Sequence, residues 1–199
     1  MRAKNEDSVK RTALIVAVAV VLVAATTVVL VARIFGPHSD GPLTERPAHG
    51  WAVPAEPGQV IVDGLEVLTT DEGEATITSV SIDADPSEVE LIGAMVAGSG
   101  REIGAVQLIR TWPPSAAEGL GELRPAIGAV VTTEATEPWG QELILAMKTT
   151  KPGHFLRKGI TIEYEVNGKH YTSYLPGELT FCSADFMNGD ECPFLGEGP

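Results

Sequence analysis

The stretch from Thr12 to Ala32, TALIVAVAVVLVAATTVVLVA, constrains this chain more than any other feature. It holds no charged residue, no proline and no glycine, and its only polar side chains are threonines. As a helix rising about 1.5 Å per residue, roughly twenty such residues match a hydrocarbon core of about 30 Å. The sequence therefore predicts a transmembrane helix, which we place at residues 12–34.

A cleavable signal peptide is the main alternative to an anchor. The apolar core of a signal peptide is usually about 7–15 residues long and ends in a small-x-small cleavage site. Here the run is longer, and it ends in Leu30-Val31-Ala32, with leucine where a small residue is required. A buried core helix without a polar face would need a much larger protein around it. We favour an uncleaved anchor, with cleavage as the alternative.

The charges that flank the apolar stretch predict its direction. Four basic residues precede it, whereas Arg33 is the only basic residue among the dozen that follow. The positive-inside rule then places the N-terminus in the cytoplasm. We expect residues 1–11 to form a cytoplasmic stub of a single-pass protein in the cell membrane, in contact with the lipid bilayer through residues 12–34. The rest of the chain is then outside.

The part of the chain that follows the apolar stretch is strongly acidic. Of the 14 basic and 27 acidic residues, five and two lie in the first 33 positions, which leaves 9 basic against 25 acidic residues and a net charge of −16. Such a surface repels nucleic acid and anionic lipid head groups. The composition therefore argues against a nucleic-acid partner, and its simplest role is to keep the domain soluble.

Two cysteines, Cys182 and Cys192, both lie in the portion expected to be outside. An even number of cysteines in an exported domain predicts a disulfide bond. Zinc binding is a poorer interpretation, because two thiols with nine residues between them and no neighbouring histidine do not have zinc-ligand spacing.

Proline and glycine divide the outer portion into a linker and a domain. Segment 35–58 contains five prolines and four glycines. Proline removes backbone donors and favours extended geometry, so we expect a linker that holds the domain away from the bilayer. Residues 59–199 are then the folded domain.

The sequence of this domain consists of short runs rich in β-branched residues, separated by turn residues. Such a pattern favours an all-β fold, an Ig-like antiparallel β-sandwich of about 7–9 strands. One helix is expected at Ala116–Leu123, where Ser115 and Glu118 have capping-box spacing after a pair of prolines. The expected strands are Gln59–Thr69, Ala75–Asp83, Val89–Ala97, Glu102–Arg110, Ala126–Thr133, Glu142–Lys148, Ile160–Val166 and Lys169–Leu175, with a short piece at Thr180–Cys182.

The hairpin around Asn167-Gly168 is the most specific local prediction. Asn-Gly is the preferred pair for a two-residue type I′ turn, and this loop length sets Val166 opposite Lys169 and Tyr164 opposite Tyr171. Alternation then predicts a core face and a wet face. The core face holds Ile160, Ile162, Tyr164, Tyr171 and Leu175, and the wet face holds Glu163, Glu165, His170 and Thr172. Glu142–Lys148 lacks clean alternation, so we expect it to be covered on both sides.

No residue pattern in the chain indicates catalysis. There is no G-x-S-x-G elbow, and the disulfide would consume both thiols. We therefore expect no catalytic residue and no cofactor. A cell-wall enzyme with paired carboxylates stays as an alternative, although nothing selects a pair.

Metal or small-ligand binding is the other alternative. For copper, His154 and His170 are candidates together with Met95, Met147 and Met187, but these residues are scattered along the chain. For calcium, Asp185, Asp190 and Glu191 lie in the cysteine loop without EF-hand spacing. The simpler interpretation is methionine in a core and a solvated acidic loop.

The segment G-I-T-I-E-Y-E-V-N-G-K-H-Y-T followed by L-T-F-C, within residues 153–182, resembles uncharacterised bacterial proteins that have one N-terminal span and an Ig-like outer domain. The resemblance implies an Ig-like fold and no known activity. Together with the anchor and linker, it leads us to expect a non-enzymatic interaction or accessory module of the cell envelope with a protein partner.

Overall fold

The computed structural model of this chain describes residues 41–45, 50–71, 73–97, 106–109, 112–114, 123–132, 140–189 and 191–195. Within these ranges, no helix is long and apolar enough to cross a membrane. The expected stub and anchor, and residues 115–122 of the expected helix segment, lie outside the described residues. The compact unit that contains the described residues extends from Ser39 to Pro199.

The described residues form strands and one short 3-10 turn, η2 at Ala184–Phe186. The strands are β1 (Leu43–Glu45), β2 (Trp51–Pro54), β3 (Val60–Thr70), β4 (Ala75–Asp83), β5 (Val89–Ala97), β6 (Val106–Ile109), β7 (Leu123–Pro125), β8 (Val130–Val131), β9 (Gln141–Thr149), β10 (His154–Val166) and β11 (Lys169–Cys182).

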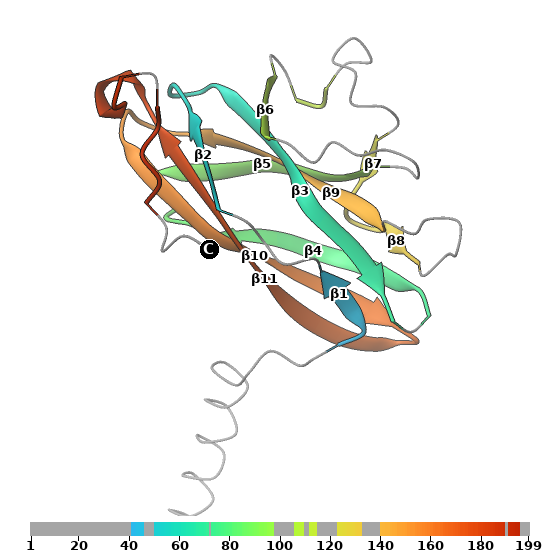
Figure 1. The fold of residues 1–199 in the computed structure, drawn as a ribbon. Helices are drawn as coiled ribbons and strands as arrows, with labels where there is room; N and C mark the ends of the chain where they lie inside the picture. The colour runs from blue at the N-terminus through green and yellow to red at the C-terminus, as the bar shows by residue number, and fades with distance from the viewer. Residues whose placement is uncertain are drawn as a thin grey trace, which may run out of the picture. The chain divides into compact units, whose positions relative to one another are not determined.

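These strands form two sheets (Figure 1). Sheet A has the order β1-β3-β9-β5-β7, with β6 also paired to β3. Sheet B has the order β2-β11-β10-β4-β8. All strand pairs are antiparallel except β2 and β11, which run parallel. The described part of the domain is therefore all-β, as the residue pattern predicts.

The main core lies between the two sheets. Sheet A contributes Ile61, Leu68, Leu143, Leu145 and Met147 from β3 and β9, all without exposed surface. Sheet B contributes a matching set from β4, β10 and β11: Ile77, Ile160, Ile162, Tyr164, Leu179 and Phe181. Burial of apolar side chains of this size stabilises a fold by about 1.5–3 kcal/mol each, so this layer holds the sheets together.

Sheet A carries a second apolar cluster on its other face. Val62, Ala97, Ile109, Ile144 and Ala146 are buried there. Gly93 on β5 lies under the indole of Trp112, whose ring occupies the place that a Cβ would take. Strand β9 contributes to both clusters and is buried along nearly its whole length. The expectation that Glu142–Lys148 is covered on both sides is confirmed.

A buried ion cluster joins the two sheets. Arg157 on β10 donates from Nη1 to Asp63 Oδ2 on β3 at 2.7 Å, and its Nη2 lies 3.8 Å from Glu66 Oε1. The same Nη2 donates to the Gly177 carbonyl at 2.8 Å. All three charged side chains are at most 5% exposed. Each carboxylate occupies an inward position of sheet A that alternation would otherwise assign to an apolar residue.

The predicted hairpin is confirmed in full. Val166 pairs with Lys169, Glu165 with His170, Tyr164 with Tyr171 and Ile162 with Ser173. Asn167 and Gly168 have φ of 52° and 76°, as a type I′ turn requires. The strands Ala75–Asp83 and Val89–Ala97 also have the predicted bounds.

Several expected boundaries differ from the structure. Two pieces of the expected linker, Leu43–Glu45 and Trp51–Pro54, are strands β1 and β2. They sit at sheet edges, where proline is tolerated because one side of the strand needs no partner. The parallel pairing of β2 departs from a wholly antiparallel sheet.

Other departures concern strand length. Of the described residues within Ala126–Thr133, Val130–Val131 forms a strand, and Leu123, expected at a helix end, begins β7. The pieces Lys169–Leu175 and Thr180–Cys182 are one continuous strand, β11. The pairing of β10 and β11 carries an irregularity between Arg157 and Gly159, which absorbs the change of register near Pro176.

Candidate functional site: the outer face of sheet B

The outer face of sheet B is the face of β4, β10 and β11 that points away from the main core. Its residues alternate with the buried Ile160, Ile162 and Tyr164 and with their partners on β4. It is made of hydroxyl, carboxyl and imidazole side chains, namely Thr76, Thr78, Ser79, Ser81, Asp83, Thr161, Glu163, Glu165, His170, Thr172 and Tyr174. This composition is typical of a face that stays in contact with water or a polar ligand.

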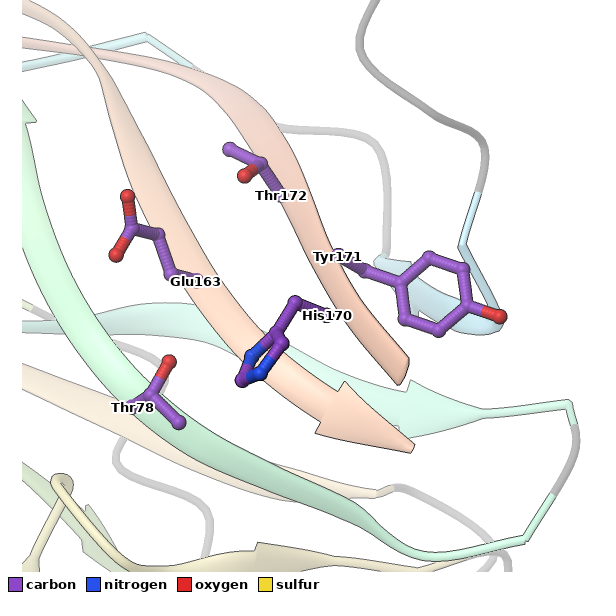
Figure 2. Close-up of a pocket in the computed structure, with 5 residues that line it drawn as sticks. All are labelled: Thr78, Glu163, His170, Tyr171 and Thr172. Atoms are coloured by element: carbon purple, nitrogen blue, oxygen red, sulfur yellow. The ribbon is translucent and has the colours of Figure 1, made fainter. Parts of the chain in front are cut away.

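A hollow of about 310 Å³ lies on this face, lined by Thr78, Glu163, His170, Tyr171 and Thr172. Figure 2 shows that Thr78, Glu163, His170 and Thr172 come from three neighbouring strands and stand on the same side of the sheet. The Tyr171 ring points away from the other four. The hollow therefore presents two hydroxyls, one carboxylate and one imidazole.

A bulge in the pairing of β4 with β10 brings Thr78 to the hollow. Glu163 pairs with Ser79 and Tyr164 with Ile77, so Thr78 lies between them as the extra residue. Ile77 still points into the core, while Thr78 is exposed beside Glu163. A regular strand would place residues 77 and 79 on one face and only residue 78 on the other, so the bulge enriches the polar face by one side chain.

His170 and Glu165 form a cross-strand pair beside the hollow. Their Nε2 and Oε2 atoms are 3.9 Å apart, and the side chains are 77% and 42% exposed. An ion pair this open to water contributes little to stability, about 0–1 kcal/mol. Among the described residues Glu163 has no ion-pair partner, so its charge is available to a ligand.

The Tyr174 hydroxyl lies beside a carboxylate of this face. It donates to Asp83 Oδ2 at 3.1 Å across the sheet. Partial burial raises the pKa of Tyr174 most, the hydrogen bond to Asp83 and the charge of Asp83 raise it further, and the charge of Arg157 lowers it by a lesser amount. With Asp83, Glu163 and Glu165 as its carboxylates, this face is acidic.

The two cysteines expected to pair form the disulfide Cys182–Cys192, with Cα atoms 5.8 Å apart. The bond holds the segment after Cys192 against sheet B. There Pro193 O lies 2.6 Å from His154 Nε2, and the Leu195 N–H donates to Thr180 Oγ1 at 3.0 Å. His154 thus contacts Pro193 at the disulfide end of the β10–β11 pair, whereas His170 on β11 lies at the opposite end, next to the hairpin turn.

Among the described residues, the metal candidates do not come together. Asp185 and Glu191 are exposed, and Asp190 lies outside the described residues. Met95 packs against the outer cluster of sheet A, and Met147 is in the main core. In the described part of the chain, no three His, Cys, Asp or Glu side chains are grouped as metal ligands. Of the carboxylates described, Glu163 is the one that lines the hollow.

Strand alternation and turn chemistry identify the wet face but not the hollow. His170 and Glu163 were predicted to be on that face, whereas Thr78 could be added only once the bulge was known. A comparison of the chain with protein-family models and with curated proteins finds no match.

Proposed function

We propose that this protein is a non-enzymatic interaction or accessory module of the bacterial cell envelope, held at the cell membrane by residues 12–34. Its β-domain lies outside the cytoplasm, and the outer face of sheet B is the surface that meets a protein partner. The apolar stretch and its flanking charges support the location. The electronegative, polar outer face supports the role.

The strand order supports an Ig-like β-sandwich. In Ig domains one sheet has the order A-B-E-D and the other contains C, F and G. Sheet A has the corresponding order β1-β3-β9-β5, and sheet B has β4-β10-β11. In antibody domains a disulfide joins strands B and F. Here the corresponding strands, β3 and β10, are joined by the Arg157–Asp63 ion pair.

The observation that carries the interaction role is the concentration of unburied polar groups on a rigid three-stranded surface. The strands β4, β10 and β11 are paired along most of their length, so the side chains of the outer face are held at fixed spacing. Pre-ordered groups lose little conformational entropy on binding, which favours recognition. The negative charge of the face suits a partner that offers basic side chains.

Site-specific photo-crosslinking of the full chain in its native membranes tests this proposal. A crosslinking side chain at Thr78, on the outer face of sheet B, should capture one specific protein. The matched control is a crosslinker at the exposed Glu90, on β5 of sheet A, which should capture none. Equal labelling from both positions, or no adduct from Thr78, would contradict the proposal.

A small polar ligand is a second candidate occupant, and the hollow itself favours it. Its volume of about 310 Å³ lies at the lower end of the range for small-molecule pockets, roughly 300–1,000 Å³. A screen of cationic and polyhydroxylated small molecules by thermal shift would identify such a ligand. The shift should disappear in Glu163→Gln and persist in Glu90→Gln.

A further inference from the structure

Three sulfur atoms lie together where β11 ends. Cys182 and Cys192 are joined by the disulfide, and the thioether sulfur of Met187 is 3.4 Å from Cys182 Sγ. Cys182 is buried and Met187 is half-buried. Met187, a copper candidate together with the histidines, thus contacts the disulfide at Cys182.

Met187 is held at this position by backbone contacts. The 3-10 turn at Ala184–Phe186 begins with Ala184 N–H donating to Glu56 Oε1 at 2.9 Å. Ser183 N–H donates to the Gly153 carbonyl at 3.0 Å, and Met187 N–H donates to the Ala184 carbonyl at 3.2 Å. These bonds tie the loop to the rest of the domain independently of the disulfide.

Cys192 is also held by contacts on both sides. Asn188 and Glu191 exchange backbone hydrogen bonds at 2.8 and 3.3 Å, just before it. After it, Pro193 and Leu195 contact His154 and Thr180. None of these contacts passes through the disulfide bond, so we expect the two thiols and the thioether to stay near one another when the bond is reduced.

We infer that the reduced form of this loop is a binding site for one Cu(I) ion, with Cys182, Cys192 and Met187 as its three ligands. A phosphine or dithiol reductant supplies two electrons, and with two protons the disulfide becomes two thiols. The metal ion then displaces both thiol protons and forms two thiolate bonds. The third bond is to the Met187 thioether, which has no proton to lose.

The chemistry of the ligands selects the metal. Thiolate and thioether sulfurs are soft donors that favour Cu(I) over oxygen-preferring ions such as calcium and magnesium. Structural zinc is normally held by four Cys or His ligands, a set that these three sulfurs do not complete. With metal–sulfur bonds of about 2.3 Å, three sulfurs around one ion are separated by about 4 Å, close to the spacing of Met187 and Cys182.

Metal binding at this site depends on the redox state of the Cys182–Cys192 disulfide. In the oxidised protein neither cysteine sulfur is a thiolate, which is the form that binds metal. The site is therefore closed while the bond is intact and opens when the bond is reduced. This inference does not depend on the proposed partner surface, because the loop lies at the opposite end of β11 from His170.

Competition with a chromophoric Cu(I) chelator tests the site. The full chain in non-ionic detergent is first reduced with a phosphine. The phosphine is then removed under anaerobic conditions, and the reduced chain is titrated into the Cu(I)–chelator complex. We expect the reduced chain to withdraw one Cu(I) per molecule and the oxidised chain to withdraw none. Cu(I) binding of equal affinity by the oxidised chain would overturn the inference.

Matched methionine variants separate the third ligand from the cysteine pair. Met187→Leu should weaken Cu(I) binding at least tenfold, whereas Met95→Leu, on sheet A, should leave it unchanged. Cys192→Ser should abolish tight binding, and near-ultraviolet circular dichroism checks that each variant is folded. Full affinity in folded Met187→Leu would show that the thioether is not a ligand and would overturn the three-sulfur site.

Discussion

The outer faces of the two sheets differ in the side chains that they carry. Sheet A buries an apolar cluster there, around Val62, Ile144 and Ala146, in addition to its share of the main core. Sheet B leaves its outer face to hydroxyl, carboxyl and imidazole groups and to a hollow. Sheet A thus has apolar packing on both faces, whereas the outer face of sheet B around the hollow is polar and exposed.

This difference follows from the sequences of the strands. β9 reads Gln-Glu-Leu-Ile-Leu-Ala-Met-Lys-Thr, with consecutive apolar residues that serve both faces, whereas β10 alternates through Ile160, Ile162 and Tyr164. Continuous apolar runs belong to strands covered on both sides, and alternation belongs to strands with a wet face. Substitutions in the two sheets test this contrast.

The largest effect is expected where the two sheets meet. Arg157→Ala removes the cation from two buried carboxylates and should lower the free energy of unfolding by about 3–5 kcal/mol. Chemical denaturation measures the loss. The matched control is Lys158→Ala, the exposed neighbour on the same strand, which should change stability by about 0.5 kcal/mol or less.

A loss below about 1 kcal/mol for Arg157→Ala would contradict this expectation. It would mean that Asp63 and Glu66 are satisfied without the guanidinium, and that the ion cluster does not couple the sheets.

The next effect compares the two outer faces directly. Ile144→Ala leaves a cavity in the outer cluster of sheet A and should cost about 2–4 kcal/mol, because Ile144 has no exposed surface. Thr78→Ala, on the outer face of sheet B, should cost about 0.5 kcal/mol or less. Urea unfolding curves of the two variants test the contrast. Similar losses for both would remove the distinction between the faces.

A smaller effect is expected at the hairpin of sheet B. Gly168 has φ of 76° with open space around it, so Gly168→Ala introduces backbone strain without a steric clash. The expected loss is about 1–2 kcal/mol. Asn167→Gly is the control, because glycine accepts the φ of 52° at that position. Thermal unfolding by circular dichroism gives both values, and an equal loss for the two would contradict the turn assignment.

The smallest effect concerns the turn at which the chain passes from sheet B to sheet A. Hydrogen bonds from the Ser87 hydroxyl and N–H hold the pKa of Asp85 below its ordinary value of 3.8. Because the folded pKa is lower, this stabilisation is present above pH 3.8 and is lost as the pH falls through the folded pKa.

Asp85→Asn should therefore lower the melting temperature slightly at about pH 7, and this effect should shrink as the pH falls below 3.8 toward the lower pKa of the folded state. Melting curves across this range measure the difference. An effect that is independent of pH would show that the charge of Asp85 is not involved.

Much of the fold could be predicted from the residue pattern. Ala75–Asp83 and Val89–Ala97 have the expected bounds because their alternation and their flanking turns are local signals. The edge strands β1 and β2 were missed because prolines and glycines dominate their segment. Their strand state depends on partners in β3 and β11, which local propensity does not reveal.

The candidate sites were less predictable. His170 and Glu163 could be placed on a wet face, but the hollow needs Thr78, which a bulge brings to that face. The disulfide was predictable because the chain has only two cysteines. The position of Met187 against it depends on a turn anchored by Glu56, far away in sequence.

Local spacing and composition are enough to predict the alternation of the strands, the Asn167-Gly168 register, the disulfide partner and the acidity of the domain. They also predict the membrane anchor at residues 12–34. The burial of Arg157 against Asp63 and Glu66, and the contact of Met187 with Cys182, depend on the tertiary structure. Such contacts join residues far apart in the chain, and they form only when two packed sheets and anchored loops determine which side chains meet.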